Sequence, residues 1–160
     1  MKTLVVFFSL EGNTKFIAQI VADQLQADIL ELETKKAYPS EGFKKYFWGG
    51  KSVFFKEQPE LTNKNIDLSN YDTLVVGTPV WAGSFAPPIN TFLNQYKFEH
   101  KKVALFACHG GGGAEKCFAK LKEALATNEF IGKIDFLDPL KHNKEEISKE
   151  AAQWATKLSI

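Results

Sequence analysis

The sequence predicts an α/β fold: a single doubly wound domain over residues 1–160, with helices on both faces of a five-stranded parallel sheet. Three observations carry this prediction. The apolar runs are continuous rather than alternating, as in strands that are buried on both faces. Segments with helical spacing separate these runs, which indicates parallel strands joined by right-handed crossovers. A chain of 160 residues also suits one domain with its own core.

Five segments have the composition of buried strands, and the last of them is the least apolar. They are Thr3–Phe8, Asp28–Leu32, Thr73–Gly77, Val103–Ala107 and Lys133–Leu137. Runs such as LVVFF, LVVG and VALFA are continuous rather than alternating, as expected for strands buried on both faces. These segments account for the predicted sheet.

Four segments between the strands have apolar residues at helical spacing. They are Asn13–Gln26, Pro88–Gln95, Ala114–Ala126 and Lys144–Leu158. In the first, Phe16, Ile17, Ile20 and Val21 fall on one side of the helix. The segment 38–71 is less regular but contains too many aromatic residues for a disordered linker. We expect it to form a helix and a trailing loop over one face of the sheet.

The composition excludes several classes of protein. Hydrophobic residues make up 44% and charged residues 24% of the chain, as in globular proteins, and no run is long enough to span a membrane. The short apolar run at the N-terminus lacks a small-residue cleavage site, so we expect a cytoplasmic protein. The net charge is +1 and arginine is absent, which argues against nucleic-acid binding. The two cysteines, Cys108 and Cys117, are expected to be reduced and near the core.

Ligands of open α/β sheets bind beyond the carboxyl ends of the strands, and three of these ends have unusual sequences. The first is Ser9–Thr14, which opens the first predicted helix. Backbone N–H groups at a helix N-terminus, with small polar side chains, suit a phosphate group. Gly12 would let the backbone turn tightly around that anion. The alternative is an ordinary turn in which Ser9 or Asn13 caps the helix.

The other two segments follow the third and fourth strands. In Thr78–Ser84, Trp81 offers a flat apolar surface on which a planar ligand could stack, or else it packs beneath its own loop. In Cys108–Gly113, four consecutive glycines suggest a close approach of backbone to ligand, or a loop that binds nothing. His109 could also act as an acid–base residue, although no neighbouring feature marks it as one.

Taken together, these three loops resemble those of the flavodoxin family. Phe8-Ser9-x-x-Gly12-Asn13-Thr14 resembles the loop that binds the phosphate of flavin mononucleotide (FMN). Gly77–Trp81 resembles the loop beside the isoalloxazine ring, and the glycines after Cys108 resemble the third FMN loop. The resemblance covers nearly the whole chain. It is nearest to the short-chain flavodoxins and to a branch called flavodoxin family 4.

The resemblance implies FMN as the cofactor and a strand order of 2-1-3-4-5, with FMN at the switch between the first and third strands. It implies FMN contacts by Ser9, Leu10, Glu11, Gly12, Asn13 and Thr14 at the phosphate, by Thr78, Pro79, Val80, Trp81, Ala82 and Gly83 beside the ring, and by Cys108, His109, Gly110 and Gly111 at its pyrimidine end. Glu11 stands where many members have threonine, so we expect its carboxylate to face away. The third loop lacks the usual aromatic residue, so stacking would fall to Trp81 or to an aromatic residue of Phe47–Phe55.

The implied function is electron transfer between redox partner proteins, a reductase and an electron acceptor, by a monomer or weak dimer. One hypothesis is that the Gly83 peptide turns to accept a hydrogen bond from the reduced flavin. The neutral charge and the aromatic-rich segment also suit an NAD(P)H-dependent FMN reductase that acts on quinones or similar small acceptors. A third possibility is an interaction module that has lost its cofactor, for which Glu11 is the only support. Neither a nucleic acid nor a membrane is an expected partner.

Overall fold

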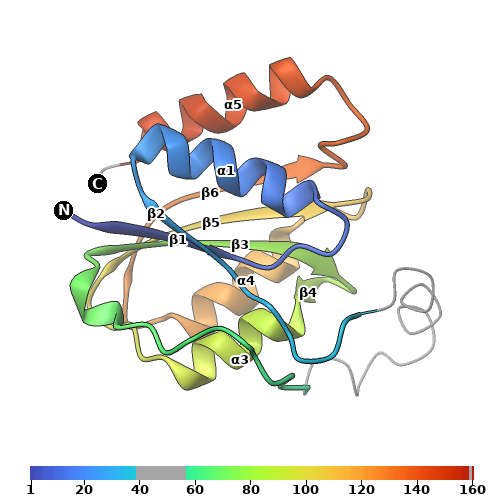
Figure 1. Ribbon diagram of the computed structural model, residues 1–160. Coiled ribbons are helices and arrows are strands. Elements are labelled where there is room, and N and C mark those ends of the chain that lie inside the picture. The colour runs from blue at the N-terminus through green and yellow to red at the C-terminus, as the bar shows by residue number, and fades with distance from the viewer. Residues whose placement is uncertain (39–56, 159) are drawn as a thin grey trace.

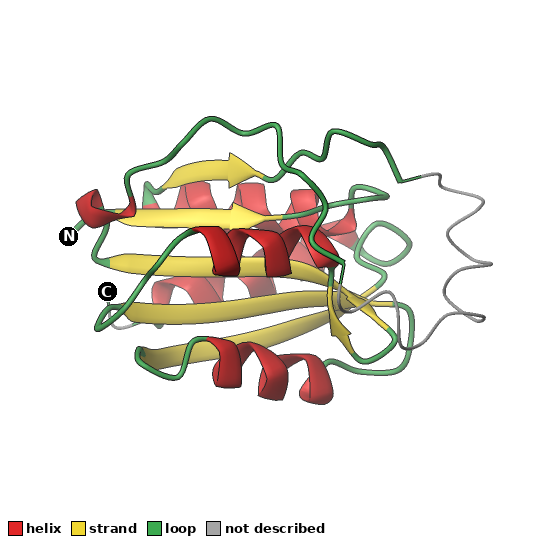
Figure 2. Cartoon of the chain, turned by 90° about the horizontal axis from the view of Figure 1, so that it is seen from below, coloured by secondary structure: helices red, strands yellow, loops and turns green. Residues whose placement is uncertain are grey.

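The computed structural model describes residues 1–38, 57–158 and 160 and has an α/β fold with helices on both faces of one sheet (Figure 1). Its parallel strands are β1 (Thr3–Phe7), β2 (Asp28–Glu31), β3 (Thr73–Trp81), β5 (Lys102–His109) and β6 (Glu129–Leu137). They lie in the order β2-β1-β3-β5-β6. Because β5 and β6 are the fourth and fifth parallel strands, the predicted order 2-1-3-4-5 is confirmed. Figure 2 shows that the parallel strands all point the same way.

The described helices lie in pairs on the two faces of the sheet. They are α1 (Asn13–Leu25), α3 (Pro87–Gln95), α4 (Glu115–Ala124) and α5 (Lys144–Thr156), with a short 3₁₀ turn at Leu68–Asn70. Figure 1 shows α1 and α5 above the sheet and α3 and α4 below it. None of the described helices is both long and apolar enough to cross a lipid bilayer.

Each face of the sheet has its own apolar core, because successive residues of a strand point to opposite faces. Under α1 and α5 the buried side chains include Val5, Phe7, Ile17, Val75 and Phe106. Under α3 and α4 they include Leu4, Val6, Leu74, Phe92, Leu105 and Phe118. The central strands β1, β3 and β5 are buried on both faces, which explains their continuous apolar runs.

Three strands are longer than the sequence predicts. β5 runs from Lys102 to His109 rather than from Val103 to Ala107, so Cys108 and His109 lie at the end of a strand and not in the predicted loop. β3 continues past Gly77 because Thr78 and Pro79 still pair with β5. It then turns back into the two-residue strand β4 (Ser84–Phe85), which pairs with it in antiparallel fashion. β6 begins at Glu129 rather than Lys133, and its register with β5 shifts between Val103 and Ala104. The predicted loop after the third strand is therefore a strand end followed by a hairpin.

The predicted helix within 38–71 falls largely on residues 39–56, which lie outside the described part of the chain, as do the aromatic residues of Phe47–Phe55. The described residues 57–71 contain the 3₁₀ turn and an isolated bridge between Thr34 and Leu61, and no α-helix. Asp67 caps the 3₁₀ turn by accepting a hydrogen bond from the N–H of Ser69.

Candidate functional site

Three loops meet at one edge of the sheet. Because β1, β3 and β5 are parallel neighbours, their carboxyl ends lie side by side, at the edge to which the arrows in Figure 2 point. The loops are Phe8–Gly12 after β1, the turn at Ala82–Gly83 after β3, and Gly110–Ala114 after β5. Beside the first and third loops, the Thr14 hydroxyl in the first turn of α1 forms a hydrogen bond with the Cys108 thiol near the end of β5.

The loop after β1 presents hydrogen-bond donors at the N-terminus of α1. Ser9 Oγ accepts hydrogen bonds from the N–H groups of Gly12 and Lys15, both at 3.2 Å. Since these two bonds occupy the lone pairs of Ser9 Oγ, its hydroxyl hydrogen remains available for an anion. Gly12 has φ +95°, a left-handed conformation that glycine adopts readily. With the first-turn N–H groups and the positive end of the helix dipole, this loop fits a phosphate group.

The side chains of Asn13 and Thr14 hold this loop in place. Asn13 Oδ1 accepts a hydrogen bond of 2.9 Å from the N–H of Leu140, in the loop between β6 and α5. Its amide NH₂ is left to donate to a ligand. Thr14 is buried, and its hydroxyl meets Cys108, so its backbone N–H is what it can offer an anion.

Leu10 and Glu11 complete the predicted phosphate loop. Leu10 is partly buried and packs against the core under α3 and α4. Glu11 is exposed, and the first turn of α1 contains no acidic residue. A carboxylate at that turn would repel an anion, so its absence favours phosphate binding.

Thr78 secures the hairpin after β3. Its buried hydroxyl donates to the carbonyl of Pro79 at 2.9 Å and accepts from the N–H of Ala86 at 3.0 Å. Both hydrogen-bonding capacities are therefore used within the chain. Pro79 and Val80 are half-buried, and Val80 pairs with Phe85 of β4.

Trp81 is 5% exposed and packs within an aromatic cluster. Its ring lies edge-on to Phe8 and to Tyr38, with ring centres 5.6 Å apart in each pair. The indole is therefore packed against aromatic side chains from two other segments of the chain. A flavin contact by Trp81 stays a prediction.

The turn at Ala82–Gly83 has two left-handed residues in succession. The φ angles are 48° at Ala82 and 72° at Gly83, between the paired residues Trp81 and Ser84. A two-residue hairpin loop with both φ values positive is a type I′ turn. The side chain of Lys116 from α4 lies beside Gly83, where an added Cβ would find Lys116 Cδ at 3.6 Å. Ala82 holds a conformation that is strained for a residue with a Cβ.

The third segment begins with a buried thiol and a half-buried histidine. Burial raises the pKa of the Cys108 thiol to about 12, so it stays protonated. His109 Nε2 lies 2.8 Å from Asp135 Oδ2, and His109 Nδ1 accepts a hydrogen bond of 3.2 Å from the N–H of Gly111. Gly110 lies near Asp138, whose carboxylate oxygens would be 3.9 Å from an added Cβ.

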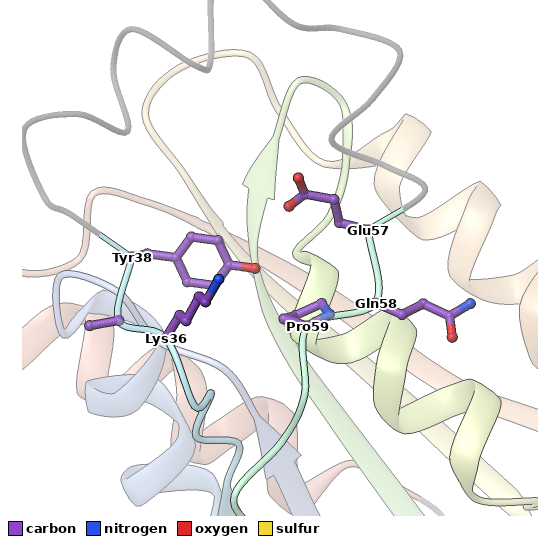
Figure 3. Close-up of a pocket in the computed structure, with 6 residues that line it drawn as sticks. Lys36, Tyr38, Glu57, Gln58 and Pro59 are labelled. Atoms are coloured by element: carbon purple, nitrogen blue, oxygen red, sulfur yellow. The ribbon is translucent and has the colours of Figure 1, made fainter.

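A pocket of about 360 Å³ opens beside the aromatic cluster. Its lining residues are Lys36, Ala37, Tyr38, Glu57, Gln58 and Pro59. Figure 3 shows the Tyr38 ring extending from one wall toward Pro59 and Glu57 on the other. Burial, with a smaller effect of the Glu57 carboxylate, raises the pKa of Tyr38 to about 12.

Three residues that shape this edge are not among the predicted FMN contacts: Tyr38, Asp135 and Leu140. Asp135 and Leu140 lie in segments without a predicted ligand role, whereas Tyr38 opens the aromatic-rich segment 38–71 that suits a reductase. Leu140 follows the fifth predicted strand. Because ligands generally bind beyond strand ends, that position could have marked it as part of the site. Asp135 and Tyr38 are distant from the three loops in the sequence and reach the site only because of the fold. No local motif therefore marks them.

The model of the family described as flavodoxin matches residues 2–154. This chain belongs to the flavodoxin family. Among solved structures, a flavoprotein from Lactobacillus acidophilus in complex with FMN is 26% identical, with 96% of this chain and 98% of that chain covered and a TM-score of 0.71. A candidate flavoprotein from Bacteroides eggerthii is 22% identical, with coverage of 99% and 98% and a TM-score of 0.80. An uncharacterized protein of Archaeoglobus fulgidus is 25% identical over 92% of this chain and 95% of its own length.

Proposed function

We propose that this flavodoxin-family chain binds FMN and carries electrons between redox partner proteins, a reductase and an acceptor. The observation that carries the proposal is the phosphate cradle built by Ser9, Gly12 and the first turn of α1. The Lactobacillus acidophilus flavoprotein, of similar fold and size, was solved with FMN. Bound FMN supplies one- and two-electron redox chemistry, and the protein supplies binding, orientation and electrostatics.

Each loop has a part in this proposal. The Ser9 hydroxyl, the Asn13 amide and the first-turn N–H groups of α1 would hold the phosphate. The turn at Ala82–Gly83 and the backbone from Cys108 to Gly111 would meet the flavin ring. The buried, protonated Cys108 thiol adds no negative charge there. The side chain of His109 already has two partners and is not free to act as an acid–base residue in this arrangement.

Two measurements on the purified protein test the proposal. Titration with FMN, followed by quenching of flavin fluorescence, determines whether the protein binds it. Stepwise anaerobic reduction of the FMN-loaded protein, followed by visible spectra, then determines whether FMN is reduced in two one-electron steps or in a single two-electron step. Two separate one-electron steps support the carrier. A failure to retain FMN would favour the interaction module that has lost its cofactor.

The pocket beside Tyr38 favours a second candidate function, an NAD(P)H-dependent FMN reductase that acts on quinones or similar small acceptors. Its volume of about 360 Å³ lies within the range of small-molecule sites. A near-neutral chain also lacks the field that would steer a charged partner protein. Reduction of bound FMN in a single two-electron step, with oxidation of NADPH or NADH in the absence of another protein, would favour this candidate.

A further inference from the structure

His109 and Asp135 face each other across two neighbouring strands. In the register of β5 and β6, Ala107 pairs with Asp135 and His109 pairs with Leu137. His109 and Asp135 are therefore diagonal neighbours whose side chains point to the same face of the sheet. The distance from His109 Nε2 to Asp135 Oδ2 is 2.8 Å, and the side chains are 11% and 41% exposed. Asp135 thus fixes the orientation of a largely buried imidazole.

The hydrogen bonds of the ring also define its tautomer. A backbone N–H can only donate, so the bond from Gly111 makes His109 Nδ1 an acceptor. The proton of the neutral ring is then on Nε2, where it is donated to the Asp135 carboxylate. Asp135, His109 and the Gly111 backbone form a directed chain from β6, through the end of β5, into the loop. Loss of the Asp135 acceptor would remove one of the two hydrogen bonds that favour this tautomer.

The described residues give little other support to the loop that receives this hydrogen bond. Among the described residues, no atom lies within 4 Å of a Cβ added at Gly111, Gly112 or Gly113, so no described side chain packs over these positions. Ordering the backbone of each residue costs about 1–2 kcal/mol, and more for glycine. Within the described part of the chain, the bond to His109 is the side-chain hydrogen bond that reaches the Gly110–Gly113 backbone. That single contact therefore has a large influence on the conformation of the loop.

We propose that His109, held in its tautomer by Asp135, is a positioning residue that fixes the Gly110–Gly113 loop in the conformation that receives the flavin. This inference rests on the proposed function for its ligand, while the geometry of the loop itself does not depend on the ligand. It differs from the sequence prediction that His109 meets the pyrimidine end directly.

Three variants separate positioning from other roles. His109→Leu removes the acceptor for the Gly111 N–H. His109→Asn keeps an amide oxygen near the place of Nδ1, so it can still accept that hydrogen bond. His142→Leu is the matched control, because His142 is exposed. We expect FMN binding to weaken about tenfold in His109→Leu, to stay within about threefold of the natural protein in His109→Asn, and to be unchanged in the control.

A second readout uses the FMN-free protein. In ¹⁵N-labelled protein near pH 8, we expect the ring nitrogens of His109 to report a proton on Nε2 and none on Nδ1. The amide hydrogen of Gly111 should exchange slowly for a loop residue. Asp135→Leu should populate the other tautomer and speed this exchange. Thermal unfolding, followed by circular dichroism, establishes that each variant is folded before the comparison is made.

The outcomes separate this inference from the proposed function. A proton on Nδ1 in the natural protein would overturn the inference, as would unchanged exchange of the Gly111 amide in a folded His109→Leu variant. If His109→Leu does not fold, Asp135→Leu decides by the same exchange measurement. If the natural protein fails to bind FMN but has the Nε2–H tautomer and a slowly exchanging Gly111 amide, the proposed function fails and the positioning of the loop stands.

Discussion

At the scale of single residues, the phosphate loop depends on the left-handed conformation of Gly12. Its φ is +95°, and an added Cβ would lie 3.3 Å from Leu140 Cδ1. Alanine in a left-handed conformation costs about 1–2 kcal/mol, so Gly12→Ala should either destabilise the loop or move its N–H groups away from the anion. We expect FMN binding to weaken about tenfold, as measured by fluorescence titration.

Two controls identify the cause of that loss. The double variant Gly12→Ala with Leu140→Ala removes the steric contact but leaves the backbone strain, so FMN binding should stay weak. Gln19→Ala changes an exposed residue on the same helix and should leave binding unchanged. Full recovery in the double variant would mean that crowding by Leu140, and not the backbone conformation, is responsible.

The two thiols are a second prediction at this scale. Burial raises the pKa of Cys108 and of Cys117 to about 12. Because the thiolate is the reactive form, near pH 8 only about one thiol in ten thousand would be ionised in the folded protein. We expect both to resist alkylation in the native protein and to react in concentrated urea, as counted by mass spectrometry. Rapid labelling of either thiol in the native protein would contradict its buried environment.

At the scale of elements, the hairpin between β3 and β4 carries strain that can be relieved. Ala82 has φ 48° in a two-residue turn, and asparagine tolerates this conformation better than alanine. Ala82→Asn creates the Asn-Gly pair preferred in such turns. We expect the free energy of unfolding in urea to rise by about 0.5–1 kcal/mol. A comparable decrease would mean that the turn adopts another conformation in solution.

The same turn limits how the hypothesis on the Gly83 peptide can be tested. Gly83 has φ 72°, whereas proline requires φ near −65°, so Gly83→Pro would break the hairpin rather than isolate the peptide. Gly83→Asn keeps a residue that tolerates the left-handed region. An added Cβ there would have ordinary contact with Lys116.

The packing of β3 against β5 depends on a glycine in the middle of the sheet. Gly77 pairs with Phe106, and an added Cβ would lie 2.0 Å from Phe106 Cζ. Because Phe106 is fully buried, its ring has no room to move. We expect Gly77→Ala to lower the free energy of unfolding by about 3 kcal/mol. Adding Phe106→Leu should recover part of this loss, and independent, additive losses would contradict the contact.

The sequence predicts those features of the fold that are marked by residues close together in the chain, and it misses those that depend on strand pairing. The apolar runs predicted the strands themselves, because strands buried on both faces have continuous apolar sequences. Their order came only from the resemblance of the three loops to the flavodoxin family. The length of β3 was wrong because Thr78 and Pro79 join the sheet only through their pairing with β5. The pair His109–Asp135 was missed because its members are 26 residues apart and meet only through the register of β5 and β6.

At the scale of the whole molecule, the charges are balanced overall, and several of them are paired near the site. The chain has 20 basic and 19 acidic side chains. Around the carboxyl edge of the sheet, Lys15 pairs with Glu31, Lys133 with Glu115 and Lys141 with Asp138. These exposed pairs contribute little to stability, but they reduce the field at the site. Electron exchange at this edge should therefore depend little on electrostatic steering.

Small acceptors of opposite charge test this expectation without a partner protein. The FMN-loaded protein is reduced anaerobically and mixed with anionic ferricyanide or with a cationic hexaammine complex, in stopped flow. Raising the ionic strength from about 0.01 to about 0.15 M shortens the Debye length from about 30 to about 8 Å, and a steered reaction would change steeply over this range. We expect each rate to change by less than about threefold. Strong dependences of opposite sign for the two acceptors would instead reveal a charged surface around the flavin and contradict this expectation.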